Sequence, residues 1–238
     1  MKLNILAFGA HPDDVELGCG GTLLKHIDSG DTVGIIDLTR GELGTRGTAE
    51  MRDSEASESS KVLGIAFRDN MGFRDGFFCN DEIHQLEIIK RIRYHQPDIV
   101  ICNAVTDRHT DHRMGAELIS KACFLSGLRK IETQYLNKVQ LAWRPAAVYH
   151  YIQDRYLKPD VIVDITPFIE KKLDAIRCFK SQFYDPTSNE PVTAISTKEF
   201  IDFLNGRAME MGRLIGVTYG EGFTTERSIG VKKLTDLL

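Results

Sequence analysis

The chain has 238 residues and a formal net charge of −4, with 42% hydrophobic and 27% charged residues. These values are typical of a globular protein, and the length allows one or two domains. The charge and the pI of about 6.0 exclude a broad attraction for nucleic acid or anionic lipid. The apolar residues 3–10 follow no basic region, so they predict neither a signal peptide nor a membrane span. We therefore expect a cytoplasmic protein.

Five cysteines are spread along the chain, and no two of them form a C-x-x-C pair. Their odd number and wide spacing argue against a disulfide framework and against a cysteine-rich zinc site. We interpret them as reduced, mostly buried small hydrophobic residues.

The first half of the chain alternates apolar runs with helical patterns. The runs at residues 3–8, 32–38 and 98–103 are rich in Ile and Val and predict buried parallel strands. Apolar residues recur at helical spacing in residues 17–27, 83–92 and 114–125. This alternation predicts an α/β fold with a mostly parallel sheet and helices on its faces.

The second half is less regular. It predicts strands at residues 147–152 and 161–165 and helices at residues 167–180 and 197–215. Residues 181–196 contain two prolines and predict a long loop, a type of segment that is often functional. Since no linker or repeat divides the chain, we expect one domain over residues 1–238 with an irregular C-terminal portion.

The sequence His11-Pro-Asp13-Asp14 lies between the first predicted strand and the first predicted helix. Open α/β sheets keep their active sites at such strand-to-helix turns. His11 and Asp14 are three residues apart and can converge on one point, and a nitrogen with a carboxylate oxygen suits Zn²⁺. A catalytic zinc site needs a third protein ligand from elsewhere.

The third ligand is expected in the loop after the predicted strand at residues 98–103, where His109 and His112 precede a helix. If His11, Asp14 and His112 hold the metal, Asp13 remains as the general base beside the zinc-bound water. His109 is then placed to donate a proton or a hydrogen bond to the oxyanion or leaving group.

One more polar residue near the two motifs has an expected role, and each motif taken alone has a simpler structural explanation. Asp111 could orient a histidine that binds the metal. Taken alone, His-Pro-Asp-Asp also fits a turn with an Asp N-cap, and the His109 segment also fits a solvated loop. The placement of both motifs after two separate strands favours a shared site.

Glycines and arginines near the motif are open to two interpretations. Gly18, Gly20 and Gly21 lack the pattern of a phosphate-binding loop and predict close packing of the helix on the sheet. Residues 40–52 predict a polar loop in which Arg52 contacts a polar or anionic substrate, or in which Arg46 and Arg52 only pair with nearby glutamates. The turn at Tyr219 is a possible pocket wall.

These motifs together resemble the LmbE-like, or PIG-L, family of zinc-dependent de-N-acetylases of N-acetylglucosamine conjugates. The resemblance rests on residues 10–14, on Gly20-Gly21-Thr22, on residues 41–52 and on His109-x-Asp111-His112. Within the family, the chain resembles the short bacillithiol-pathway branch, which removes acetate from N-acetylglucosaminyl malate.

The resemblance implies one Zn²⁺ per subunit bound by His11, Asp14 and His112, Asp13 as base and His109 as acid or oxyanion stabiliser. It also implies a Rossmann-like three-layer sandwich and a homo-oligomer, often a hexamer. The family commonly has proline where this chain has Thr110. This difference affects the expected rigidity of the loop and leaves the ligands unchanged. Fe²⁺ or Co²⁺ could occupy the same ligands.

The predicted substrate is a small N-acetyl sugar. A malate carboxylate would be stabilised by a cationic partner, and Arg52 or Arg108 could provide one. Two alternatives remain: a deacetylase of another N-acetylglucosamine conjugate or chitooligosaccharide, and a non-catalytic nucleotide-binding module. The missing glycine fingerprint and the density of ligand types argue against the second.

Overall fold

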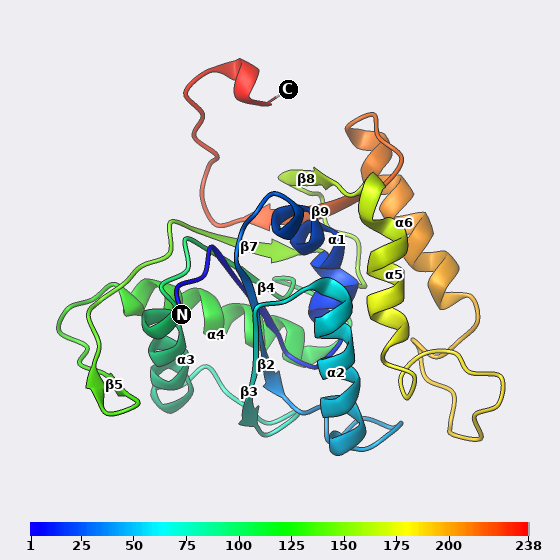
Figure 1. Cartoon of the computed structure of the whole chain (residues 1–238), viewed down its shortest axis with the longest axis horizontal. Coiled ribbons are helices and arrows are strands. Elements are labelled where there is room, and N and C mark those ends of the chain that lie inside the picture. Colours follow the sequence, from blue (N-terminus) through cyan, green and yellow to red (C-terminus); the bar gives the residue numbers. More distant parts are fainter. Residues whose placement is uncertain (238) are drawn as a thin grey trace.

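The computed structural model describes residues 1–237 and contains a seven-stranded sheet with helices on both faces (Figure 1). The elements, in chain order, are β1 (Ile5–Gly9), α1 (Asp14–Asp28), β2 (Val33–Thr39), α2 (Ala49–Leu63), β3 (Phe67–Phe73), α3 (Glu82–His95), β4 (Ile99–Cys102), α4 (Thr110–Ser126), β5 (Gln134–Tyr135), β6 (Lys138–Val139), β7 (Ala147–Tyr151), β8 (Val161–Asp164), η1 (Thr166–Phe168), α5 (Ile169–Arg177), α6 (Phe200–Leu214), β9 (Gly220–Thr225) and η2 (Leu234–Leu237).

Side chains of β1 alternate between two hydrophobic cores, one on each face of the sheet. Leu6 and Phe8 join the core under α3 and α4, whereas Ile5 and Ala7 join the core under α1. Every residue of β1 is buried, which explains why its sequence is a continuous apolar run rather than an alternating one. The two cores make this part of the molecule a sandwich of three layers.

The sheet has the order β3-β2-β1-β4-β7-β9-β8. β1 pairs in parallel with β2 on one side and with β4 on the other, and only β9 runs antiparallel to its neighbours β7 and β8. The chain therefore changes direction along the sheet between β1 and β4, which creates a crevice at their carboxyl ends. The mostly parallel α/β sandwich predicted from the sequence is confirmed.

Among the longer elements, α2, β3 and β9 lie where the apolar pattern predicted none. α2 begins within the predicted loop at residues 40–52, because the Thr48 side chain accepts a hydrogen bond from Met51 N and caps the helix, so Arg52 is helical. β3 forms an edge of the sheet and none of its residues is fully buried, and β9 contains two glycines. None of the three carries the hydrophobic periodicity on which the prediction depends.

The glycines of α1 pack against neighbouring elements as predicted. A Cβ on Gly18 would lie 2.2 Å from the ring of Tyr151 in β7, so a larger residue would push the helix off the sheet. The helix is kinked at Cys19, and the carboxylate of Glu221 in β9 accepts hydrogen bonds from the backbone N–H groups of Gly21 and Thr22 beyond the kink. β9 thus anchors the second part of the helix.

The cysteines have no disulfide partner, and Cys19, Cys102 and Cys123 are buried. Burial of three of the five agrees with their interpretation as mostly buried residues, whereas Cys79 is exposed and Cys178 is partly exposed. Among residues 1–237, no helix combines the length and apolar character that crossing a membrane requires.

Candidate active site

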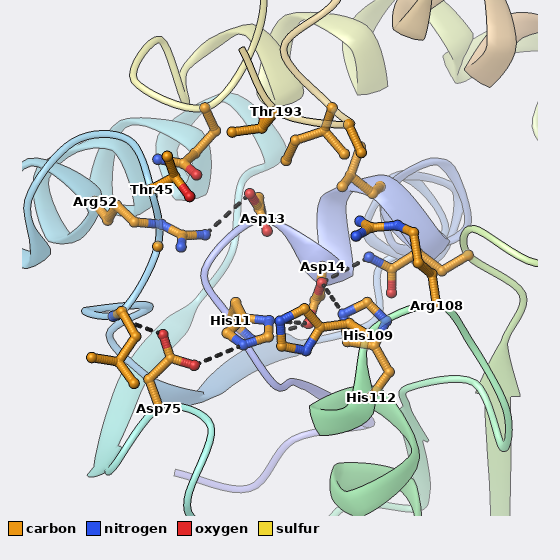
Figure 2. Close-up of a pocket in the computed structure, with 17 residues that line it drawn as sticks. His11, Asp13, Asp14, Thr45, Arg52, Asp75, Arg108, His109, His112 and Thr193 are labelled. Carbon is orange, nitrogen blue, oxygen red and sulfur yellow. Dashed lines mark hydrogen bonds and ion pairs between the residues drawn. The ribbon is translucent and has the colours of Figure 1, made fainter. Parts of the chain in front are cut away.

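Asp13 and Asp14 lie in the turn that joins β1 to α1. Asp13 precedes the first helical residue and has a φ of 118°, which lies in the left-handed region that residues other than glycine rarely adopt. Their side chains point in different directions: Asp13 points toward Arg52, and Asp14 points toward the histidines (Figure 2). The turn therefore presents two adjacent carboxylates to two different sets of partners.

The Asp14 carboxylate is buried and held by three hydrogen-bond donors. Its Oδ2 accepts from the backbone N of His11 at 2.9 Å and from Asn103 Nδ2 at 3.0 Å. Its Oδ1 accepts from Gln153 Nε2 at 2.7 Å. Burial raises the pKa of Asp14, but His112 and His11 outweigh it and hold this pKa well below its usual range. Asp14 is therefore a charged carboxylate in a fixed position at neutral pH.

His112 lies between two carboxylates. Its Nε2 is 3.2 Å from Asp14 Oδ1, and its Nδ1 is 2.7 Å from Asp107 Oδ2. Burial lowers the pKa of His112, but Asp14 and Asp107 overcome this and raise it to about 9. One ring nitrogen thus faces the centre of the site, and a carboxylate orients the ring from the other side, as is usual for histidines that bind metals.

His11 has the same arrangement with the nitrogen atoms exchanged. Its Nδ1 lies 3.5 Å from Asp14 Oδ2, while its Nε2 lies 3.1 Å from Asp75 Oδ1 and 3.4 Å from Asp111 Oδ2. Burial lowers the pKa of His11, but the three carboxylates outweigh it and raise this pKa well above its usual value. Asp111 and Asp75 therefore both lie beside His11 Nε2, where a carboxylate can orient the ring.

The residues fit a divalent cation. Two imidazole nitrogens and one carboxylate oxygen, from His11, His112 and Asp14, are the donor types that zinc prefers. The carboxylates that favour a proton on both imidazoles would also stabilise a metal ion, whose binding releases such protons. The groups whose ligand atoms all lie within 4.8 Å of one another are His11 with His109 and His112, and His11 with Asp75 and Asp111. The predicted set shares His11 and His112 with the first group and adds Asp14, which contacts both histidines.

His109 caps the N-terminus of α4 and lies beside the other two histidines. Its ring centroid is 4.6 Å from that of His11 and 5.3 Å from that of His112. Its Nδ1 accepts a hydrogen bond from the backbone N of Asp111, so the neutral ring carries its proton on Nε2. Burial, with His11 and His112 adding to it, lowers the pKa of His109. The ring is thus a neutral donor at the rim of the site.

The Asp13 carboxylate is buried against the guanidinium of Arg52. Arg52 Nη2 lies 3.1 Å from Asp13 Oδ2 and also donates a hydrogen bond to the carbonyl oxygen of Pro12. Burial raises the pKa of Asp13 to about 7, although Arg52 opposes the rise. Gly41 leaves space for this arginine, because a Cβ there would lie 2.0 Å from Arg52 Nη1. Neither this arginine nor Arg46 pairs with Glu42, Glu50 or Glu55, the alternative from the sequence, and Arg46 Nε lies 3.9 Å from Oε2 of the distant Glu190 instead.

A cavity of about 320 Å³ opens above these groups. It is lined by the three histidines, by both carboxylates of the turn and by segments of three loops, with Thr45 and Thr193 on one side and Arg108 on the other (Figure 2). Arg108 is half-exposed and forms an ion pair with Asp154. The sequence-predicted site residues therefore line one cavity, except for Asp111, which contacts His11 without lining it.

The loop at residues 181–196 forms a wall of this cavity. Gln182, Thr193 and Ile195 line it, and the buried Arg46 fixes the loop by donating to the Ser181 carbonyl oxygen at 2.8 Å. Tyr219 does not line the cavity and packs instead against the core between α5 and α6, so its interpretation as a wall of the site is wrong.

Four polar residues of the site were not found from the sequence: Asp75, Asn103, Asp107 and Gln153. Asp107 lies in the loop after β4 that was already singled out, and Asn103 was the last residue of the strand predicted before this loop. Their proximity to His112 in the sequence was a usable signal. Asp75 and Gln153 follow β3 and β7, and only the strand order places them beside His11 and Asp14.

The chain is similar to proteins of one family. Residues 6–123 match the model of the family described as PIG-L: GlcNAc-PI de-N-acetylase. The diacetylchitobiose deacetylase of Thermococcus kodakarensis is 30% identical over 230 residues, which cover 92% of this chain and 81% of that protein.

Solved structures similar to this chain support the same family. The conserved protein TT1542 of Thermus thermophilus has a TM-score of 0.85 and 32% identity, covering 97% of this chain and 98% of that one. The N,N'-diacetylchitobiose deacetylase of Pyrococcus horikoshii, complexed with an inhibitor, has a TM-score of 0.78 and 28% identity, covering 98% and 88% of the two chains. With the fold and both motifs in place, the chain belongs to the PIG-L family of LmbE-like de-N-acetylases.

Proposed function

We propose that this protein is a metal-dependent hydrolase that removes acetate from an N-acetylglucosaminide and leaves a free amine. The observation that carries the proposal is the separation of two neighbouring carboxylates: Asp14 contacts two histidines, and Asp13 contacts an arginine. Family membership and the similarity to a diacetylchitobiose deacetylase support the same reaction.

In this proposal His11, Asp14 and His112 hold the metal ion. A bound zinc ion would supply positive charge that polarises the acetamide carbonyl and lowers the pKa of a water molecule. Fe²⁺ or Co²⁺ would fit the same donors. Asp107, Asp75 and Asp111 keep the two imidazoles oriented.

Asp13 acts as the general base that accepts a proton from the attacking water. Its carboxylate is buried, lines the cavity and pairs with Arg52 rather than with a histidine. His109 faces the same cavity and donates from Nε2 to the oxygen of the tetrahedral intermediate, or passes a proton to the departing amine. Base and donor thus come from the ends of two different strands.

Arg52 is proposed as a positioning residue for Asp13. From the sequence it was a substrate contact, but its guanidinium already donates to Asp13 and Pro12. We therefore expect Arg52→Met to lower kcat by about 10-fold or more, because the base loses its fixed orientation. A purely substrate-binding arginine would instead raise KM and leave kcat unchanged, and steady-state kinetics separates the two.

The matched control for Arg52→Met is Arg40→Met. Arg40 lies in the same segment and forms an exposed pair with Asp53 and Glu50. Its replacement should leave both constants near the wild-type values. An Arg52→Met enzyme with wild-type kcat would contradict the positioning role.

For the substrate, a neutral N-acetyl sugar fits the contacts better than the malate conjugate suggested by the family resemblance. Both arginines at the cavity already face carboxylates, since Arg52 contacts Asp13 and Arg108 contacts Asp154. An anionic aglycone would have to compete with these pairs. Deacetylation of N-acetylglucosaminyl malate stays a prediction, and a chitooligosaccharide is the substrate that we favour.

Acetate release from diacetylchitobiose and from N-acetylglucosaminyl malate, measured side by side, tests the function. We expect release from the first substrate at the higher rate, loss of release with a chelator, and recovery when zinc is added back. Faster release from the malate conjugate would reverse the preference. No release from either substrate by the zinc-loaded protein would contradict the proposed function, and nucleotide binding would then favour the non-catalytic alternative.

A further inference from the structure

A second cavity adjoins the candidate active site. It has a volume of about 270 Å³ and shares Arg108 and Ala194 with the first cavity. Its other walls include Asp154 from the segment after β7 and three residues at the start of α6, namely Glu199, Phe200 and Phe203. The two cavities therefore lie side by side, with Arg108 and Ala194 between them.

Aromatic rings form one side of this second cavity. The rings of Phe200 and Phe203 are stacked with centroids 5.9 Å apart and an interplanar angle of 25°. Phe203 is 40% exposed, although large aromatic side chains gain most from burial. The C–H face of a pyranose ring is apolar and packs well on an aromatic ring, whose face is partly negative.

The aromatic side is fixed to the candidate active site through Arg207. Its guanidinium lies over the ring of Phe203 at 5.1 Å from the centroid. The same group donates to the carbonyl oxygens of Gln153 at 2.8 Å and Asp154 at 2.7 Å. Gln153 in turn holds Asp14, so α6 and the proposed metal ligand share one hydrogen-bonded connection.

The charged groups of the second cavity favour a neutral ligand. Two carboxylates, Asp154 and Glu199, face one guanidinium, Arg108, which is already paired with Asp154. An anionic ligand would meet the second carboxylate, and the guanidinium of the nearby Arg207 already donates to two backbone carbonyl oxygens. Sugar hydroxyl groups, in contrast, can donate to carboxylates and accept from guanidinium N–H groups.

We propose that the second cavity is a sugar-binding subsite that takes the second ring of a di- or oligosaccharide, with Phe203 as its main contact. This inference rests on the proposed deacetylase function, since it places the reacting N-acetyl group in the first cavity. It adds to the preference for a chitooligosaccharide a place for the second ring, beside Phe203 at the start of α6.

The test compares Phe203→Ala with the wild type on N-acetylglucosamine and on diacetylchitobiose. We expect kcat/KM for the disaccharide to fall by roughly two- to tenfold, the usual range for one aromatic contact, with the value for the monosaccharide unchanged. Phe203→Tyr should keep most of the disaccharide rate because it keeps the ring. Phe124→Ala, which removes an exposed ring on α4, is the matched control.

An equal fall on both sugars, or no fall on either, would overturn the subsite. Calorimetric titration with diacetylchitobiose provides a readout that needs no turnover. A Kd raised by roughly two- to tenfold in Phe203→Ala supports the subsite even if no acetate is released and the proposed function fails. An unchanged Kd overturns the subsite even if deacetylation is observed.

Discussion

Replacing Asp13 by asparagine is expected to lower kcat by about 10²- to 10⁴-fold, the range typical of losing a general base. Asparagine keeps the shape of the side chain and tolerates the positive φ that Asp13 adopts, so the turn should survive the change. The amide cannot accept the proton that the carboxylate takes from water. The effect is measured as single-turnover acetate release at saturating substrate.

Asp53→Asn is the matched control for this variant. Asp53 is an exposed carboxylate of α2 that pairs with Arg40. Its loss should leave kcat within about twofold of the wild type. If Asp13→Asn retained full turnover, the base would have to be another group, and the roles of the two neighbouring aspartates would be wrong.

Replacing His112 by alanine is expected to abolish metal binding and turnover together. Its Nε2 lies 3.2 Å from Asp14 Oδ1 at the centre of the site, so the change removes one of the three proposed ligands. We expect the loss in metal affinity to exceed the roughly 10–100-fold that follows removal of a partner of a metal-binding histidine. Metal titration of the purified variant measures this directly.

Asp107→Asn provides the graded comparison for His112→Ala. The amide removes the charge 2.7 Å from His112 Nδ1 but leaves the ligand atom in place, so affinity should fall by the roughly 10–100-fold range itself. His84→Ala, a histidine paired with Asp81 at the surface, should bind metal like the wild type. Wild-type metal affinity in His112→Ala would exclude it from the ligand set.

The buried strands of the sheet could be predicted because burial on both faces leaves a direct trace in the sequence. β1 and β2 are entirely buried, β1 has no polar side chain, and β2 is apolar apart from Asp37 and Thr39, so their positions were clear. β3 and α2 lie at the outside of the fold, and their polar residues face solvent or other polar groups. Such elements are stabilised by their neighbours in space, which a single sequence does not reveal.

The same limit applies to the site. His11, Asp13, Asp14 and His112 follow the ends of two strands that are neighbours in the sheet, so their convergence followed from general rules of α/β folds. Asp75 comes from beyond the edge strand β3, and its contact with His11 depends on how one loop folds back.

Arg52 shows how a long side chain can mislead. Its position after a strand suggested a substrate contact, but its location in the first turn of α2 brings the guanidinium to Asp13. Long side chains reach several alternative partners, so their contacts depend on where the backbone of the next element begins.

The most direct test of the account is the metal content of Asp13→Asn and Asp14→Asn, prepared in parallel and measured with the kcat of each. We expect Asp13→Asn to retain about one metal ion per subunit without substantial turnover, because its carboxylate is not a ligand. Asp14→Asn should lose the metal and the activity together, because its oxygens contact both His11 and His112. Equal metal contents in the two variants would contradict the claim that adjacent carboxylates perform different tasks.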